Sequence, residues 1–229
     1  MSTDMKTRDL LGPFIGNVTE TSVKLWLHAP HLAPGESLSL AVTLHRAELD
    51  EKGRAIYEGQ PTAEVARGTL VVAYDDLNVG VVTLDGLEPG ATYYYRLLHM
   101  DEGVTGAGEP AGGTLRPAEL PGLTNRDLFF RTLPEGGYKN QLDFLLMSCH
   151  NPDTAKKTDG FKGFGVWAQI PQIMSSNENV RFAILAGDQA YGDEIETQVL
   201  KEPDLRRRQE LYLGVYRKFW DNEHYRRVL

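Results

Sequence analysis

Between residues 11 and 133, apolar and polar side chains alternate in short runs that are separated by glycine and proline. In residues 22–27, for example, Val23, Leu25 and Leu27 alternate with Lys24 and Trp26. A period of two is typical of strands that bury one face. About seven such runs predict an antiparallel sandwich like those of immunoglobulin and fibronectin type III domains: 12–18, 22–27, 38–44, 69–74, 80–84, 92–98 and 127–132.

Residues 87–93, Leu-Glu-Pro-Gly-Ala-Thr-Tyr, resemble the turn before a late strand of those two domain types. The resemblance implies that the Tyr93 hydroxyl bonds back to the backbone at a corner. Trp26 would be the matching core aromatic. The alternative is that Trp26 lies on the outer face and contacts the next domain, because it shares its parity with Lys24.

After residue 140 the pattern changes to that of a parallel sheet covered by helices. Residues 142–147 and 180–186 are almost continuously apolar, and residues 164–174 carry apolar side chains at helical spacing, with Pro171 interrupting the helix or beginning its second turn. Pro203 is suited to the first turn of a final helix. The order strand, helix, strand, helix predicts a parallel α/β unit.

Glycine and proline mark the predicted boundaries. Residues 134–137 read Pro-Glu-Gly-Gly, so we expect a β-sandwich over residues 1–134, a linker over 135–140 and the α/β unit over 141–229. The stretch 102–125 is also rich in glycine and proline and lacks periodicity. It is predicted to be a long loop between the last two strands of the sandwich.

Composition narrows the classes of partner. A formal net charge of -8 argues against binding nucleic acid through a basic surface, and the basic residues 206–208 fit a solvated helix face. No apolar run approaches the roughly 20 residues that cross a bilayer. The polar start favours a cytoplasmic protein, or a secreted parent whose leader was removed. A single cysteine forms no internal disulfide.

Three candidate metal ligands follow the two predicted parallel strands. Cys149 comes after residues 142–147, and Asp188 and Tyr191 come after residues 180–186. In open parallel sheets, ligands bind beyond the carboxyl ends of the strands. A carboxylate such as Asp188 bridges two cations, whereas a cysteine thiolate and a tyrosine phenolate favour a transition metal such as ferric iron. Taken singly, a buried inert cysteine and a Gly-Asp capping turn are the alternatives.

The combination of Ser-Cys at 148–149 and Gly-Asp-x-x-Tyr at 187–191 resembles the alkaline phosphatase D family, a relative of the purple acid phosphatases. In that family an immunoglobulin-like domain precedes a calcineurin-like metallophosphoesterase domain. The resemblance implies that Cys149 and Tyr191 bind iron and that Asp188 bridges to a second, divalent ion, calcium or zinc. It also implies hydrolysis of phosphate esters by metal-bound hydroxide at this binuclear or multinuclear site.

The chain departs from the family pattern in two ways. His150 stands where the family usually has an amide side chain, and we consider His150, Asn151 and Asp193 as second-shell candidates. The sequence also lacks the family's remaining ligand motifs, Gly-Asn-His, Asp-Asp-His and Gly-His-x-His. We therefore expect a fragment that carries half of the metal site and is inactive alone.

Two parallel strands leave sheet edges and apolar faces uncovered, so we also expect further chain, or an oligomer, to complete the C-terminal sheet. The alternative function is a non-catalytic binding module built on the β-sandwich. Phosphatase activity of a longer chain, lost on Asp188→Asn, would favour the enzyme.

Overall fold

The computed structural model describes residues 10–49, 51, 55–56, 63–100, 115–118, 120, 128–139, 142–151, 164–177, 180–226 and 228. The chain divides into two units, Met1–Gly137 and Tyr138–Leu229. The predicted linker spans this division, and its residue 140 lies outside the described residues. None of the described helices combines the length and the apolar character needed to cross a membrane.

All seven predicted strands of the first unit form, each within a few residues of its expected limits. They are β1 (Leu11–Val18), β2 (Ser22–His28), β3 (Ser37–Arg46), β6 (Glu64–Ala73), β7 (Val79–Asp85), β8 (Thr92–His99) and β10 (Phe129–Arg131). Two short strands, β4 (Glu48–Leu49) and β5 (Ala55–Ile56), pair with each other. A third, β9 (Arg116–Pro117), pairs with β8 inside the stretch predicted as a loop. Most of that stretch lies outside the described residues.

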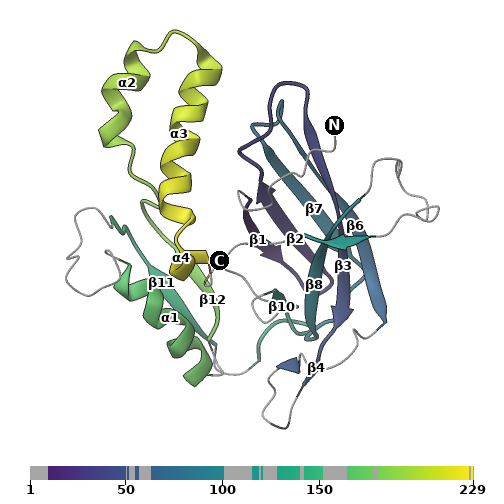
Figure 1. Cartoon of the computed structure of the whole chain (residues 1–229). Helices are drawn as coiled ribbons and strands as arrows, with labels where there is room; N and C mark the ends of the chain where they lie inside the picture. The colour runs from purple at the N-terminus through teal and green to yellow at the C-terminus, as the bar shows by residue number, and fades with distance from the viewer. Residues whose placement is uncertain are drawn as a thin grey trace. The chain divides into compact units, whose positions relative to one another are not determined.

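The long strands form one antiparallel sheet in the order β1-β2-β7-β6-β3-β8-β10 (Figure 1). Strands β6 and β7 share a single register pair, Ala73 with Val79, so the sheet bends there into two layers. A Cβ atom added to Gly68 of β6 would lie 2.7 Å from the side chain of Leu84 on β7, which shows how closely the layers face each other. The result is a sandwich or half-barrel built from one bent sheet.

The alternating pattern decides which side chains enter the core between the layers. Val23, Leu25 and Leu27 of β2 are fully buried and pack in one cluster with the inward side chains of β3, β6, β7 and β8. Trp26 points to the opposite face and is half-buried, with its ring 4.6 Å from that of Phe14. The prediction of a core tryptophan is wrong because a residue of Lys24 parity faces outward.

The predicted tyrosine corner is confirmed. Tyr93 is buried, and its hydroxyl accepts a hydrogen bond of 2.9 Å from the backbone N–H of Glu88, five residues earlier. The Glu88 carboxylate forms an ion pair with Arg46 on β3. The corner therefore joins the turn before β8 to the strand beside it.

The second unit contains the predicted pair of parallel strands. Strand β11 (Asp143–Met147) pairs with β12 (Val180–Leu185), and α1 (Gly165–Ser176) lies between them in sequence. Pro171 lies inside α1, and the helix continues past it to Ser176. One face of the strand pair packs on a buried cluster formed by Trp167 and Ile170 of α1, by its N-cap Phe164 and by Tyr225.

Four helical segments follow β12: η3 (Asp193–Ile195), α2 (Glu196–Lys201), α3 (Leu205–Trp220) and α4 (Glu223–Arg226). Asp204 is the N-cap of α3, and its carboxylate accepts a hydrogen bond of 2.7 Å from the Arg207 N–H. Pro203 therefore precedes the cap and does not lie in the first turn as predicted. An aspartate carboxylate satisfies a free N–H of the first turn, which favours this start. Arg207 also forms an ion pair with Glu210, as expected for a solvated helix face.

The other face of the strand pair is apolar and exposed. Phe144 and Phe182 stack with their ring centroids 5.4 Å apart, and Leu146 and Ile184 lie on the same face. Their exposed fractions run from 39% for Phe182 to 66% for Leu146. In the part of the chain that the structure describes, the expectation that this two-stranded sheet leaves apolar surface uncovered is thus confirmed.

Candidate metal centre

The segments that follow β11 and β12 meet at the carboxyl edge of this strand pair. Met147 and Leu185 are the last paired residues, and the Ala186 N–H extends the pairing by donating to the Met147 carbonyl at 2.7 Å. Parallel strands that end in register deliver their following residues to one place. Cys149 and Asp188 therefore leave the sheet side by side, as predicted.

Cys149 and Asp188 are in direct contact. The backbone N–H of Asp188 donates to the Cys149 sulfur at 3.3 Å, and both side chains are exposed. Gly187 makes this approach possible: its φ is +123°, and an added Cβ would lie 2.8 Å from the sulfur. No other residue type meets both conditions without strain.

Tyr191 completes the cluster. Loss of water around its phenol raises the pKa, and a hydrogen bond with Cys149 acts in the same direction. Negative charges at Cys149, Asp188 and Asp193 raise the pKa further. These groups all favour the neutral phenol, so a cation among them would reverse the balance and favour phenolate. The phenol therefore lies beside the Cys149 side chain and within reach of the charges of Asp188 and Asp193.

The three second-shell candidates are placed differently. The His150 ring packs on α1, 5.8 Å from Phe164 and 6.1 Å from Trp167. Asn151 is half-buried, and Asp193 begins η3 as an exposed residue whose charge acts on Tyr191. Asp193 is thereby linked to the cluster through its charge, and supporting roles for all three residues stay predictions.

The donor set decides which ions fit. Among the described residues, no group of three or more His, Cys, Asp and Glu side chains is arranged to hold a metal. Tyr191 would add a third donor beside Cys149 and Asp188. A thiolate, a carboxylate and a phenolate suit an acidic transition metal such as ferric iron, whereas calcium prefers oxygen donors alone.

Two residues that the sequence analysis missed support the turn. The Gln189 side-chain amide donates to the Gly187 carbonyl at 3.0 Å, and the Tyr225 hydroxyl donates to the Gln189 side-chain carbonyl at 3.1 Å. Gln189 could have been noticed by its place inside the 187–191 motif. Tyr225 carries no such signal, because it lies 36 positions further along the chain.

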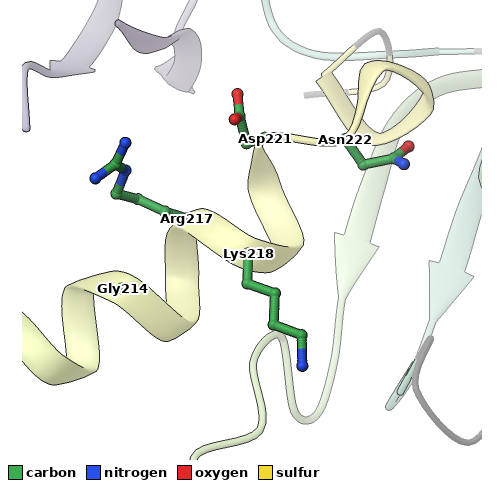
Figure 2. Close-up of a pocket in the computed structure, with 5 residues that line it drawn as sticks. All are labelled: Gly214, Arg217, Lys218, Asp221 and Asn222. Atoms are coloured by element: carbon green, nitrogen blue, oxygen red, sulfur yellow. The ribbon is translucent and has the colours of Figure 1, made fainter. Parts of the chain in front are cut away.

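A shallow hollow of about 400 Å³ lies elsewhere in the second unit, at the end of α3. It is lined by Gly214, Arg217, Lys218, Asp221 and Asn222. Figure 2 shows the Arg217 and Lys218 side chains pointing apart. Lys218 pairs with Glu194 at 3.4 Å. The two cations therefore do not converge on one ligand, and the strand edge remains the candidate site.

The described chain is thus a β-sandwich followed by a pair of parallel strands with Cys149 and Asp188 at their carboxyl edge. No protein-family model matches the chain, and no curated protein matches its sequence. Among solved structures, one described as "Structure of PhoD" superposes with a TM-score of 0.55 at 19% identity, covering 100% of this chain and 37% of that chain. At this identity the likeness shows a PhoD-like fold, and the chain spans little more than a third of PhoD's length.

A redesigned β-sandwich protein also matches, at 16% identity and a TM-score of 0.27, over 54% of this chain and 92% of that one. A score this low does not indicate a shared fold.

Proposed function

We propose that this chain contributes three ligands to the metal centre of a phosphoesterase related to PhoD. The observation that carries the proposal is the convergence of Cys149, Asp188 and Tyr191 at one sheet edge, with Asp188 and the Cys149 sulfur in contact at 3.3 Å. The likeness to PhoD over the whole chain supports it through the fold. In this proposal the second unit is the beginning of a calcineurin-like domain.

Each side chain has a definite part in this function. The Cys149 thiolate and the Tyr191 phenolate would hold iron, and the Asp188 carboxylate would hold a divalent ion, calcium or zinc, together with it. Bound there, the ions would supply Lewis-acid activation of water for attack on a phosphate ester. Gly187 keeps the edge open, because any side chain at that position would collide with Cys149.

The surroundings of Tyr191 predict how metal binding would depend on pH. A phenol surrounded by a thiol and two carboxylates is held in its neutral form when no cation is present. Binding a strongly acidic ion must therefore release a proton from Tyr191, so affinity for iron rises with pH. Bound to ferric iron, the Tyr191 phenolate would also give a visible ligand-to-metal absorption.

Loading the purified chain with ferric iron tests the proposal. We expect a visible tyrosinate band that Tyr191→Phe abolishes and Tyr94→Phe, a change on β8 in the other unit, leaves intact. Asp188→Asn should weaken retention of a second ion, measured by elemental analysis. Retention of no metal and no band at any ratio of iron to protein would reject the metal centre.

Activity is tested with 4-nitrophenyl phosphate and bis(4-nitrophenyl) phosphate, which separate monoester from diester hydrolysis. We expect no rate above background from this chain alone, and from a longer chain with a complete site a rate that depends on added metal and falls to background in Asp188→Asn. A rate that survives Asp188→Asn and chelation would assign the hydrolysis to another site.

A further inference from the structure

We propose that Gln189 and Tyr225 are positioning residues that hold the Gly187-Asp188 peptide in the orientation that the metal centre needs. This inference rests on the proposed function for the identity of the centre. We call the Gln189 and Tyr225 side chains the clamp; it is defined by hydrogen bonds among residues of the second unit.

The Gly187-Asp188 peptide is held at both of its polar ends. Its carbonyl, from Gly187, accepts a hydrogen bond of 3.0 Å from the Gln189 side-chain amide. Its N–H, from Asp188, donates to the Cys149 sulfur at 3.3 Å. Because a peptide unit is planar and includes both Cα atoms, fixing both polar ends fixes the plane and therefore the position of the Asp188 Cα, from which the carboxylate extends.

Gln189 is in turn oriented by Tyr225. The Tyr225 hydroxyl donates to the Gln189 side-chain oxygen at 3.1 Å, which leaves the amide nitrogen to face the Gly187 carbonyl. The position therefore requires one acceptor and one donor on the same planar group. Glutamine provides both, whereas a glutamate carboxylate only accepts.

Tyr225 is a rigid anchor for this chain of bonds. Its side chain is 3% exposed, and its ring lies 4.0 Å from that of Trp167 in α1. Burial raises the pKa of Tyr225 to about 12, against an opposing hydrogen bond from Trp220. The hydroxyl thus stays protonated, and stays a donor, well above neutral pH.

The clamp gives the exposed turn a connection to the core of the second unit. Asp188 and Cys149 are exposed, and Gly187, with a φ of +123°, has no side chain that could anchor the turn. The path from Trp167 through Tyr225 and Gln189 ties this turn to the packed side of the strand pair. Outer-shell hydrogen bonds of this kind typically change metal affinity by about 10–100-fold when they are removed.

The test compares Tyr225→Phe and Gln189→Glu with the control Tyr216→Phe, the same change on α3 at a ring that is 41% exposed. Titration with Co²⁺ alone, followed by the thiolate-to-cobalt band, should show about 10-fold weaker binding in the first two variants and unchanged binding in the control. The backbone order parameter S² of Asp188, measured by NMR relaxation, should fall from about 0.85 to below about 0.6 in the same two variants. Amides of β11 should keep their exchange rates, which shows that the fold is intact.

The two readouts separate this inference from the proposed function. A chain that gives no cobalt band in its unaltered form contradicts the metal centre, and the order parameter at Asp188 then decides the clamp alone. Unchanged order and unchanged cobalt affinity in Tyr225→Phe would overturn the inference. Equal losses in Tyr216→Phe would also overturn it, because they would show a general effect of removing a hydroxyl.

Discussion

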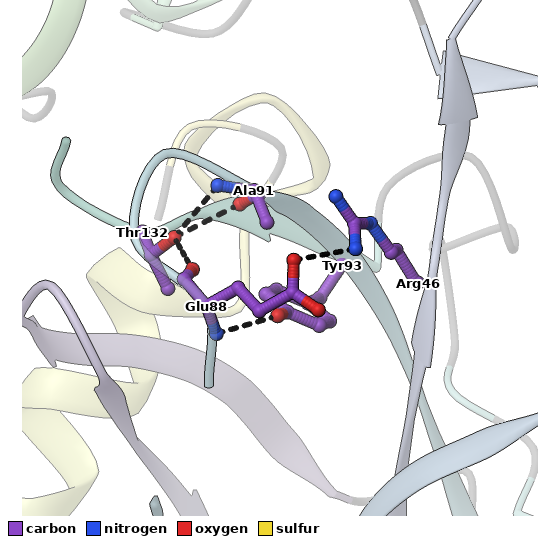
Figure 3. Close-up of polar contacts among 5 residues, drawn as sticks. All are labelled: Arg46, Glu88, Ala91, Tyr93 and Thr132. Atoms are coloured by element: carbon purple, nitrogen blue, oxygen red, sulfur yellow. Dashed lines mark hydrogen bonds and ion pairs between the residues drawn. The ribbon is translucent and has the colours of Figure 1, made fainter. Parts of the chain in front are cut away.

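Replacing Thr132 with valine should destabilise the first unit by removing one buried hydroxyl. Thr132 is fully buried; its hydroxyl accepts from the Ala91 N–H at 2.9 Å and donates to the Glu88 carbonyl at 2.7 Å (Figure 3). Valine has nearly the same shape but leaves the buried Ala91 N–H without this acceptor. An unsatisfied buried donor costs about 1–3 kcal/mol, so we expect a loss of about 2 kcal/mol.

Thr132→Ser is the matched control, since it keeps the hydroxyl and removes only a methyl group. Loss of one buried carbon costs about 0.8 kcal/mol, so serine should be clearly less damaging than valine. Tyr93→Phe removes the other bond to the Glu88 turn and should cost about 1 kcal/mol. Because both side chains hold Glu88, the double variant should lose less than the sum of the single losses.

Amide hydrogen exchange at Leu40 and Val42, in the fully buried part of β3, measures the unfolding of the first unit separately from the second. A loss of about 2 kcal/mol should raise these exchange rates roughly 30-fold in Thr132→Val. Wild-type exchange rates in Thr132→Val would refute the assignment of this stability to the hydroxyl. Exchange rates in Thr132→Ser as high as those in Thr132→Val would refute it as well.

Four further outcomes are expected in the second unit. Gly187→Ala should separate Asp188 from Cys149 and speed alkylation of that thiol, because the new Cβ would lie 2.8 Å from the sulfur; an unchanged rate would contradict the close approach. Asp204→Ala should destabilise the start of α3 by about 1 kcal/mol in hydrogen exchange, with Asp204→Asn near wild type. Ultraviolet titration should show tyrosines that ionise late, among them one near pH 12 that Tyr225→Phe removes; since the folded pKa of Tyr225, about 12, exceeds the usual value of 10.0, its stabilising contribution is intact below pH 10 and lost as pH rises toward 12. Leu146→Ser should lower binding of a hydrophobic dye while changing stability by under about 0.5 kcal/mol, because that side chain is 66% exposed.

Local sequence signals account for most of the elements. The alternation in residues 22–27 predicts both the strand and its buried face, because successive side chains of a strand point to opposite sides. Applied consistently, the same rule places Trp26 outside, and the structure agrees with the rule and not with the analogy to a core tryptophan. The short helices η3 and α2 were missed, since segments of this length carry little periodic signal.

The contact between Cys149 and Asp188 was also predictable, although the two residues are 39 positions apart. Two apolar strands joined by a helix pair in parallel, and parallel strands place their following residues at one edge. The reach of Tyr191 back to the same edge follows from its short distance in sequence. The metal-binding role of these residues stays a proposal.

By itself, the sequence determined where the strands and main helices form, which faces they bury and which side chains follow the two parallel strands, because these depend on nearby residues. Only the tertiary structure decided that the first unit is one sheet bent at Ala73 and Val79. It also decided that Tyr225 holds Gln189. Such contacts depend on the path of the whole chain through space, and no local pattern of polar and apolar residues records it.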